Sequence, residues 1–509
     1  MKVCLISPYA DISSIGIRTI SSYLKANGFK TRLVFLPQQK YFYTRDEFNA
    51  YDDNVVDNLV KLIKDDDLIG ISFMSNFYPA IKNLTEELKI KMPGKPIIWG
   101  GIHSTVRPEQ CLNTVDYICV GEGETSCLEL CQKLSRGEAT DSIPGIWTKV
   151  GGNIYKNNPE SVVLDLDKLP APDYDLNDNY ILVDRKDIIS LDMSNMRQFL
   201  GSTYWTMLTR GCPFSCTYCC NDALRMLHKD YTKTRSKSPE NLIRELLAIQ
   251  KKFPYVRYIN FTDDTLFALS EQAIKDFAEC YKKNIDIAFM VPGINPLVFT
   301  EKKFDYLVDA GLLKVRMGIQ TGSQKVLDIY KRKQDNEKVV EISKNLQKYS
   351  KKLTAPTYDI IVDNPWETKG DIIKTIRLLS RLKAPFSLNI FSLLFYPGTR
   401  LYAQGVEAGL ISEDSDYKHY NRYEPSYLNL IIVLYSIFKV PGWLLKIFMS
   451  NKLVYTEKKF PILHNILYEI MLYRRGISGL LNRDYSMFPI KLQTIFCTIL
   501  PPKKLKKYY

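Results

Sequence analysis

The chain has 509 residues, of which 45% are hydrophobic and 25% are charged. This composition is ordinary for a globular protein of several domains and excludes a low-complexity chain. The net charge is +13, and the last 71 residues contribute thirteen Lys or Arg against three Asp or Glu. The excess charge therefore belongs to the tail, for which an anionic membrane surface is one candidate partner and nucleic acid the less expected one.

The first residues, MKVCLISPYA, lack the charged and apolar regions of a secretory signal. We therefore expect a cytoplasmic protein. Its eleven cysteines are then expected to be reduced thiols or metal ligands rather than disulfides.

Strand and helix patterns alternate along residues 1–135. Strands are expected at 2–7, 31–36, 68–74, 95–101 and 115–124, and helices at 17–28, 79–92 and 125–134. This alternation predicts a doubly wound, Rossmann-like parallel sheet, with ligands outside the carboxyl ends of its strands. That edge gathers Ser7–Gly16, Ser72–Tyr78, Gly100–Thr105 and Gly121–Glu124. The glycines also suit ordinary strand-to-helix turns.

Residues 136–199 are predicted to be a connector with short strands and a proline-punctuated loop. Residues 200–410 again alternate strands and helices. Their strands are expected near 204–210, 256–264, 285–293, 314–322, 356–368 and 385–399. Repeated strand–helix units predict a barrel or partial (β/α) barrel, whose chemistry lies at the carboxyl ends of its strands.

Cys212, Cys216 and Cys219 give the spacing CxxxCxxC directly after an expected strand. Three thiolates can hold three irons of a 4Fe–4S cluster and leave the fourth iron open to a substrate. The alternative is a zinc site completed by Cys220 or His228. Zinc sites usually pair two CxxC-type knuckles, and the sequence has no second one, so we favour the cluster.

The cysteine spacing, with Tyr218 before the third cysteine, resembles the radical S-adenosylmethionine (SAM) superfamily. Further segments in matching order are Asn260–Phe267, Gly318–Ser323, Asp363–Thr368 and Tyr396–Tyr402, so the resemblance covers essentially all of residues 200–410. It implies that the open iron chelates SAM. It also implies SAM contacts from Tyr218, Asp263, Asp264, Gln320 and Ser323, although the two aspartates also suit helix capping.

Two positions depart from the pattern of this superfamily. Gln320 stands where many members have Glu, and Asp363-Asn364 replaces a commoner glycine-containing turn. The resemblance therefore leaves two features open. One is an acidic contact to SAM at position 320, and the other is the backbone spacing of the turn at Asp363-Asn364.

Residues 1–135 resemble the cobalamin-binding domain that precedes many radical SAM domains. The matching pieces are Pro8–Gly16, Gly100–Ser104 and Asp116–Glu124. The resemblance implies that cobalamin contacts Gly16, Gly100, Gly101, His103, Gly121 and Glu122. The first loop, Tyr9–Gly16, has no histidine, so we expect base-off cobalamin without a protein histidine on cobalt. We expect His103 to donate a hydrogen bond rather than bind cobalt.

Residues 411–509 are predicted to form a basic, mainly helical region. The run 427–449 is broken by Pro441 and is too short for a confident membrane span. Its apolar residues alternate with Lys439 and Lys446, as in a helix that lies on an anionic membrane surface. The alternative is a helical lid over the barrel mouth, which we slightly prefer.

The resemblance implies a cobalamin-dependent radical SAM methyltransferase acting on an unactivated carbon of a small molecule, a lipid or a lipid-linked substrate. One SAM would methylate cobalamin, and a second would give the 5′-deoxyadenosyl radical. The electron donor would be a flavodoxin or ferredoxin, and the enzyme would be cytoplasmic or peripheral on the inner face of the membrane. Alternatives are a ring-forming or oxidative radical reaction without methyl transfer, and a non-catalytic, membrane-associated metal-binding protein.

Overall fold

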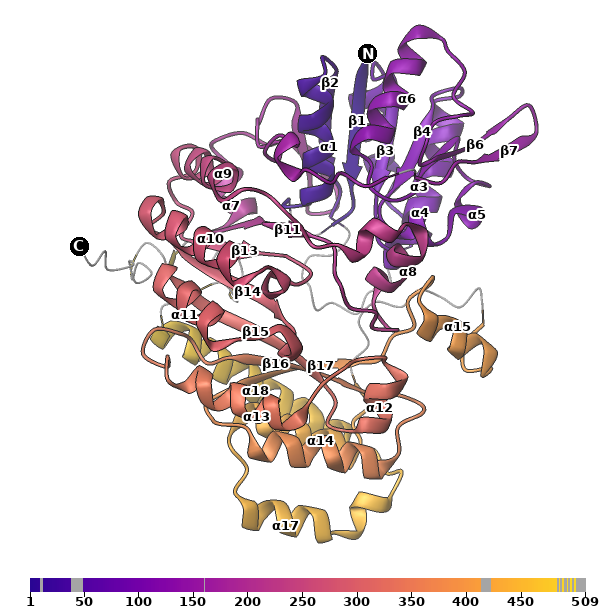
Figure 1. Cartoon of the computed structure of the whole chain (residues 1–509). Coiled ribbons are helices and arrows are strands. Elements are labelled where there is room, and N and C mark those ends of the chain that lie inside the picture. Colours follow the sequence, from indigo (N-terminus) through magenta and orange to yellow (C-terminus); the bar gives the residue numbers. More distant parts are fainter. Residues whose placement is uncertain are drawn as a thin grey trace. The chain divides into compact units, whose positions relative to one another are not determined.

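The structure is a computed structural model that describes residues 1–9, 12–37, 49–159, 161–412 and 423–482, with isolated positions after 482. The chain divides into two units (Figure 1). The first unit contains residues 1–200, 218–233 and 395–419. The second unit contains residues 201–217, 234–394 and 420–509.

The first unit is built on a nine-stranded sheet in the order β7-β6-β5-β4-β3-β1-β2-β8-β9. Its strands are β1 (Lys2–Ser7), β2 (Lys30–Phe35), β3 (Leu68–Ser72), β4 (Ile97–Gly100), β5 (Tyr117–Cys119), β6 (Ile146–Val150), β7 (Asn153–Lys156), β8 (Asn179–Val183) and β9 (Asp187–Ser190). Strands β5-β4-β3-β1-β2 are all parallel. The predicted doubly wound sheet is confirmed, and its strand order reverses between β1 and β3.

Helices cover this sheet and connect its strands. The helical elements of the first unit are α1 (Ile15–Ala26), α2 (Asp53–Ile63), η1 (Ser75–Phe77), α3 (Tyr78–Lys91), α4 (Ile102–Val106), α5 (Pro108–Cys111), α6 (Glu124–Arg136), η2 (Leu166–Lys168), α7 (Met196–Leu200), α8 (Cys220–Leu227), η3 (Lys229–Thr232) and α15 (Arg400–Glu407). Every residue of β1 and β2 after the first lysine is buried, as expected for strands covered on both faces. Helix α2 was not predicted, although Val55, Val56 and Leu59 form its buried face.

The segment predicted as a connector contributes strands to the same sheet. Strands β6 and β7 form a hairpin whose turn is Gly151-Gly152, both with positive φ, and β6 pairs antiparallel with β5. At the other end of the sheet, β8 pairs with β2 and β9 pairs with β8. Residues 136–199 therefore extend the sheet of the first unit at both ends.

The second unit is a parallel sheet of six strands in chain order, β10-β13-β14-β15-β16-β17. These strands are β10 (Thr203–Thr206), β13 (Tyr258–Phe261), β14 (Ala288–Ile294), β15 (Leu312–Gln320), β16 (Thr357–Val362) and β17 (Ser387–Ser392). A small antiparallel pair, β11 (Thr209–Arg210) with β12 (Arg235–Ser236), follows β10. This sequential order confirms the predicted partial (β/α) barrel.

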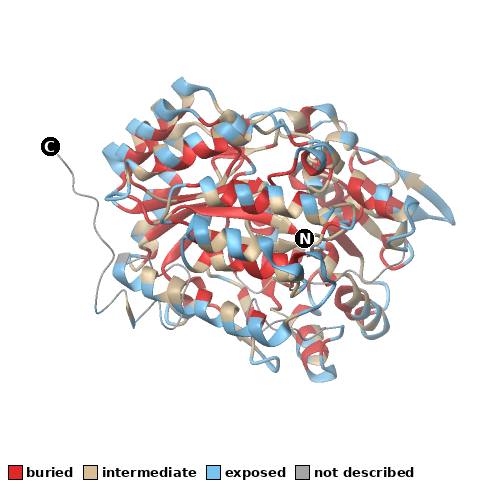
Figure 2. Cartoon of the chain, turned by 90° about the horizontal axis from the view of Figure 1, so that it is seen from below, coloured by how far each residue is buried: buried red, intermediate tan, exposed pale blue. Residues whose placement is uncertain are grey.

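Helices follow the barrel strands and cover their outer face. They are α9 (Pro239–Lys252), η4 (Leu266–Ala268), α10 (Glu271–Asn284), η5 (Pro296–Val298), α11 (Glu301–Ala310), α12 (Gln324–Ile329), α13 (Asn336–Gln347) and α14 (Lys369–Arg381). Along β15, Val315, Met317 and Ile319 are buried while the residues between them are half-buried. Because side chains alternate along a strand, β15 turns Arg316 and Gln320 away from the helix-covered face. Buried residues concentrate on the strands and inner helix faces (Figure 2).

The C-terminal region is helical, as predicted, with α16 (Tyr427–Ile437), α17 (Gly442–Ser450), η6 (Lys452–Tyr455) and α18 (Pro461–Asn482). Helix α16 is largely buried against α14 and β17. Ser436 Oγ accepts a hydrogen bond from Leu388 N at 3.3 Å, and Arg475 donates to Leu388 O. These contacts satisfy backbone groups of β17, the last strand of the sheet. Without them, this edge of the sheet would be exposed. Among the residues described, none of the helices is long and apolar enough to cross a membrane.

Candidate functional site

The three cysteines of the CxxxCxxC motif are all half-buried. Cys212 and Cys216 lie in the loop after β11, and Cys219 is the N-cap residue of α8, preceded by the half-buried Tyr218. Cys220, the first residue of α8, is exposed rather than packed. Within the described part of the chain, no three His, Cys, Asp or Glu side chains gather as a ready metal site. The fit to a cluster thus rests on the thiol donors, their spacing and their access.

The other cysteines of the first unit are poorer candidates for ligands. Cys4, Cys111 and Cys131 are buried, and burial raises the pKa of Cys111 to about 12. Burial also raises the pKa of Cys4 and of Cys131. Since iron and zinc bind the thiolate, these buried thiols suit packing and not metal binding.

Asp263 holds the backbone that leads into the cysteine loop. It lies just after β13 and is almost completely buried. Its carboxylate accepts hydrogen bonds from Leu208 N at 3.2 Å, from Thr209 Oγ1 at 2.6 Å and from Thr209 N. Burial raises its pKa to about 6. Asp263 therefore fixes the residues three and four positions before Cys212, whereas its neighbour Asp264 is exposed.

Arg332 reaches the cysteine loop from the segment after α12. Its guanidinium donates to Cys216 Sγ at 3.7 Å and to the carbonyl of Gly318. The same loop is held by Thr217, whose N–H donates to Tyr330 O at 3.0 Å and whose hydroxyl donates to Ile329 O at 2.8 Å. Hydrogen bonds and charges beside a ligand sulfur tune the reduction potential of a cluster. Sequence reasoning missed Arg332, because no local pattern connects it with a cysteine 116 positions earlier.

The segment Gly318–Ser323 turns sharply at the carboxyl end of β15. Its pairing with β16 shifts register between Gly318 and Gln320, and Gln320 adopts a φ of +67°. A Cβ on Gly318 would lie 2.6 Å from Gln320 Nε2 and 3.2 Å from Arg332 Nη2. Register shifts and non-glycine residues with positive φ cluster at functional sites.

Helix α14 holds the second half of this segment. Gly322 N donates to Thr375 Oγ1 at 2.9 Å, and a Cβ on Gly322 would lie 2.8 Å from Lys374 O. Ser323 is fully buried, and its hydroxyl donates to Asp371 at 2.6 Å. In this structure Ser323 therefore positions the segment.

Asp363 closes the carboxyl end of β16 with a φ of +60°. It occupies the turn where the commoner sequence has glycine, and it adopts the left-handed conformation that glycine favours. Its carboxylate accepts hydrogen bonds from Glu424 N and Asn429 Nδ2, each at 2.8 Å. Asp363 thus keeps a glycine-like backbone and also connects the strand end to the C-terminal region.

Glu367 is a second titratable group beyond the end of β16. It is half-buried, and burial, with the nearby charges of Asp371 and Asp363, raises its pKa to about 8. A carboxyl group with a pKa near neutral is a candidate for proton transfer. Sequence reasoning did not single it out, because the shift depends on burial and on neighbours that meet only in the fold.

In the first unit, the loops after β1 and β3 flank the point where the strand order reverses. Ser7 Oγ and Ser14 Oγ lie 2.7 Å apart, and the rings of Tyr9 and Phe77 meet edge to face at 5.3 Å. Gly16 is exposed in the first turn of α1. These loops mark the position at which sheets of this topology bind ligands.

The turn after β4 depends on its glycines. Gly100 ends β4, and Gly101 has a φ of +89°. A Cβ on Gly101 would lie 2.7 Å from Phe73 O and 2.8 Å from Phe73 N, so no other residue fits without a shift. The predicted turn therefore packs against the backbone at the end of β3.

His103 follows this turn on α4 and is fully buried. Its Nδ1 lies 3.1 Å from Ser75 Oγ, and its ring lies 4.6 Å from that of Tyr78. Burial and, to a lesser extent, Arg107 lower its pKa to about 3, so its imidazole is neutral. His103 thereby connects the loops after β3 and β4.

The turn after β5 packs against the segment that follows the cysteine motif. Gly121 has a φ of +88°, and a Cβ there would lie 2.7 Å from the hydroxyl of Tyr231. The same hydroxyl accepts from Glu122 N at 3.0 Å, and the Glu122 carboxylate accepts from Val163 N at 2.9 Å. Tyr231 on η3 is thus a contact of the predicted cobalamin loop that sequence reasoning missed.

Helices α8 and α15 are joined within the first unit by a partly buried ion pair. The Arg400 guanidinium donates to both carboxylate oxygens of Asp222, at 2.6 and 2.5 Å. Gly398, with a φ of +77°, lies against Val106, and the Arg107 guanidinium stacks over Tyr402 at 4.8 Å. The segment Tyr396–Tyr402 and the segment after the cysteines therefore both belong to the sheet domain.

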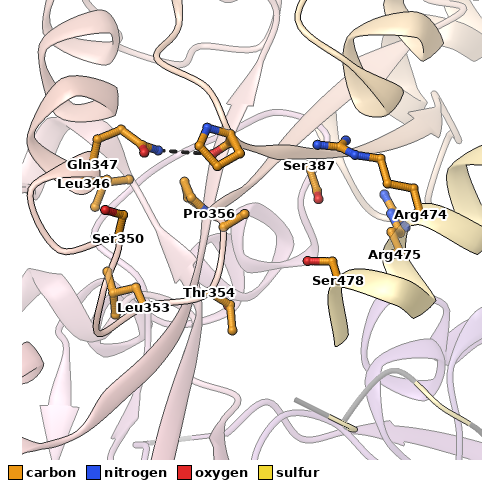
Figure 3. Close-up of a pocket in the computed structure, with 12 residues that line it drawn as sticks. Leu346, Gln347, Ser350, Leu353, Thr354, Pro356, Ser387, Arg474, Arg475 and Ser478 are labelled. Atoms are coloured by element: carbon orange, nitrogen blue, oxygen red, sulfur yellow. Dashed lines mark hydrogen bonds between the residues drawn. The ribbon is translucent and has the colours of Figure 1, made fainter. Parts of the chain in front are cut away.

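A pocket of about 160 Å³ lies at the amino ends of the barrel strands, opposite the carboxyl ends that carry the motif residues. Pro356 and Ser387, at the amino ends of β16 and β17, line it together with Arg474 and Arg475 of α18 (Figure 3). The motif residues lie at the carboxyl ends of the same strands. This pocket is therefore separate from the candidate active site.

Comparison with known families follows the same division of the chain. The model of the B12 binding domain matches residues 1–131, and the model of the radical SAM superfamily matches residues 206–379. The chain is a radical SAM enzyme with a cobalamin-binding domain. In this radical SAM enzyme, the matched regions contain the glycine turns and the cysteine motif described above.

Curated relatives of this radical SAM enzyme include proteins named as methyltransferases. An uncharacterized methyltransferase of Pyrococcus horikoshii is 25% identical over 373 residues, which are 71% of this chain and 74% of that protein. The bacteriochlorophyllide d C-8(2)-methyltransferase of Chlorobaculum tepidum is 24% identical over 384 residues, 71% of this chain and 75% of that protein.

Solved structures share the fold. The radical SAM methyltransferase TsrM from Kitasatospora setae, with tryptophan and a SAM analogue bound, superposes with a TM-score of 0.64 at 16% identity, over 80% of this chain and 76% of that chain. The cobalamin-dependent radical enzyme OxsB, with aqua-cobalamin and SAM bound, superposes with a TM-score of 0.62 at 18% identity, over 98% of this chain and 74% of that chain.

Proposed function

We propose that this enzyme is a cobalamin-dependent methyltransferase that methylates an unactivated carbon. The observation that carries the proposal is the presence in one chain of a B12-binding domain and a radical SAM domain with all three motif cysteines. The methyltransferase names of two relatives that each align with 71% of the chain support it. The match to the radical SAM superfamily argues against a non-catalytic metal-binding role.

The residues of the chain fit the cofactors that these domains take. Cys212, Cys216 and Cys219 would hold a 4Fe–4S cluster, and the turns at Gly101 and Gly121 would approach cobalamin. When bound, the cluster, SAM and cobalamin supply an electron, a hydrogen-abstracting radical and a methyl carrier. We also propose base-off cobalamin without a protein histidine on cobalt, since His103 is buried with its Nδ1 3.1 Å from Ser75 Oγ.

The protein's own contribution is to fix the loop and to hold protons. Asp263 holds the backbone before Cys212, and Arg332 donates a hydrogen bond to the Cys216 sulfur. Glu367, with a pKa of about 8, carries a proton at neutral pH and can exchange it near the strand ends.

The inner side of the barrel favours a substrate with polar groups beside an apolar part. Arg316 pairs with Asp359 at 2.9 Å, and Asn389 donates to the same carboxylate at 3.0 Å. Trp205 on β10 is exposed on the side opposite Tyr204, which bonds Glu245 of α9. A lipid or lipid-linked molecule has this mixed chemistry, and we propose it as the substrate class. We also propose a flavodoxin or ferredoxin as the electron donor.

The test is an anaerobic incubation of reconstituted enzyme with SAM that carries a deuterated methyl group, cobalamin, reductant and extracted lipids. We expect one product that gains the labelled methyl group, together with 5′-deoxyadenosine. Cys212→Ala, Cys216→Ala and Cys219→Ala should each abolish cluster loading and both products, whereas the matched control Cys220→Ala should not.

Each other outcome has a defined meaning. Formation of 5′-deoxyadenosine with a product that lacks the label would overturn methyl transfer in favour of a ring-forming or oxidative reaction. A labelled product from a water-soluble extract alone would retain methyl transfer and reject the lipid class. Stoichiometric zinc in place of iron after anaerobic reconstitution would reject the radical chemistry.

A further inference from the structure

Helix α18 is amphipathic, but its apolar stripe faces away from the protein. Its exposed apolar stripe consists of Ile462, Ile466, Ile470, Tyr473, Ile477 and Leu481, which are between 43% and 77% exposed. The spacings of four, four, three, four and four residues keep these side chains within a sector of about 100° on a helix of 3.6 residues per turn. The stripe therefore runs for about 28 Å along one side of the helix.

The opposite side of α18 is the one that anchors it to the barrel. His464 and Met471 are buried there, and His464 lies edge to face against Tyr423 at 4.8 Å. Arg474 donates to Ser436 O, and Arg475 donates to Leu388 O of β17. Because the polar and charged contacts hold the helix, the exposed isoleucines are not needed to attach it.

Helix α17 shows the same property more completely. Its sequence, GWLLKIFMS, is strongly apolar, yet none of its nine residues is buried. Trp443 is 66% exposed and Ile447 is 54% exposed. Large exposed apolar surfaces of this kind mark sites of protein or membrane interaction.

The charge on and around α17 favours a membrane over a protein as the partner. Lys439, Lys446 and Lys452 are exposed before, within and after α17. Phe438 and Tyr455, also exposed, lie beside the first and last of these. Aliphatic, aromatic and lysine side chains interleaved in this way match the acyl, interfacial and headgroup layers of an anionic bilayer.

We propose that α17 and the exposed stripe of α18 form a surface that binds the enzyme to an anionic lipid bilayer. Apolar side chains enter the boundary between headgroups and acyl chains, and the lysines meet anionic headgroups. The proposal concerns attachment and does not depend on which reaction the enzyme catalyses. Its failure would leave methyl transfer untouched.

The experiment is co-sedimentation of the full-length, anaerobically reconstituted enzyme with vesicles. One set contains phosphatidylglycerol and phosphatidylcholine in equal amounts, and the other contains phosphatidylcholine alone. We expect binding to the anionic vesicles at low salt and at least about 10-fold weaker binding to the neutral ones, since each basic residue near the surface contributes about 5-fold. Added salt should weaken the binding.

Variants test whether this surface is responsible. Ile466→Asp with Ile470→Asp should lower binding at least about 10-fold, because apolar area is lost and negative charge is gained. Asn465→Asp, an exposed neighbour on α18 outside the stripe, is the control for charge and should retain most of the binding. Lys446→Gln with Lys452→Gln should reduce both affinity and salt dependence. Formation of 5′-deoxyadenosine by each variant reports that it is folded.

Three results would overturn the proposal. The first is no binding to anionic vesicles at low salt. The second is binding that neither the stripe variant nor the lysine variant weakens, which would assign attachment to another part of the chain. The third is a dimer in solution that Ile466→Asp converts to a monomer, which would make the stripe a contact between two copies.

Discussion

The raised pKa of Glu367 makes the stability of the second unit depend on pH in a predictable direction. In the folded protein the pKa is about 8, against an ordinary value of 4.5. At a pH between these two pKa values, Glu367 therefore keeps its proton in the folded protein and has lost it in the unfolded chain. The contribution of protonated Glu367 to the free energy of unfolding is fully present below about pH 4.5 and is lost as the pH rises through about 8.

The magnitude follows from the same two values. Each pH unit between them corresponds to about 1.4 kcal/mol, so the ionised carboxylate costs a few kcal/mol at most. Partial access to solvent reduces this figure. Glu367→Gln keeps the shape of the side chain and stays neutral at every pH. The variant should therefore match the wild type near about pH 5 and exceed it in stability near about pH 9.

Thermal unfolding of both proteins across this pH range measures the effect. A gain of about 1 kcal/mol raises the midpoint of a unit of this size by about 2–4 °C, so a difference of about 5 °C or more is expected at the alkaline end. Glu341→Gln, on the exposed side of α13, is the matched control and should give a constant difference. If the difference between Glu367→Gln and the wild type is the same at both ends of the range, Glu367 ionises normally and its assignment as a proton carrier is wrong.

Two further predictions concern the strand ends and the cysteine loop. Asp363→Gly loses the hydrogen bonds to Glu424 and Asn429 but still adopts the positive φ easily, whereas Asp363→Ala loses the hydrogen bonds and is strained at that φ. The alanine variant should therefore be less stable than the glycine variant by about 1 kcal/mol and unfold at a lower temperature. Equal midpoints would show that the backbone conformation carries no strain. Arg332→Gln should load iron but shift the cluster to a lower reduction potential in a redox titration followed by electron paramagnetic resonance, because a nearby cation favours the reduced cluster. Arg332→Lys should restore part of the shift, and an unchanged potential in Arg332→Gln would limit Arg332 to a packing role.

The sequence was sufficient to predict the two sheets, because their strands are apolar runs bounded by glycine and proline. Within residues 136–199 it indicated the two short strands and the Gly-Gly turn that form the β6–β7 hairpin. It did not indicate β8, which pairs with β2 from far along the chain. The cysteine motif could be identified from its spacing alone. Arg332 and Tyr231 were not, because each acts on a partner more than 100 positions away, and Glu367 was not, because its pKa depends on burial. Long-range contacts and burial are properties of the fold that local patterns do not encode.

The strongest structural sign of a site in the second unit is backbone strain at the ends of two neighbouring strands. Gln320 ends β15 and Asp363 follows β16, and each non-glycine residue has a positive φ. Such conformations cost on the order of 1 kcal/mol or more, so they persist only where other contacts maintain them. For Asp363 those contacts are its bonds to Glu424 and Asn429.

For Gln320 the supporting feature is the missing side chain of Gly318, whose space its amide occupies. The neighbouring Gly318 carbonyl accepts from Arg332, which also donates to Cys216. The strained strand end and the cysteine loop therefore share one guanidinium. Gln320 stands where many members of the superfamily have Glu, and here the segment is held by contacts of Gly318 and Arg332 without a carboxylate at that position.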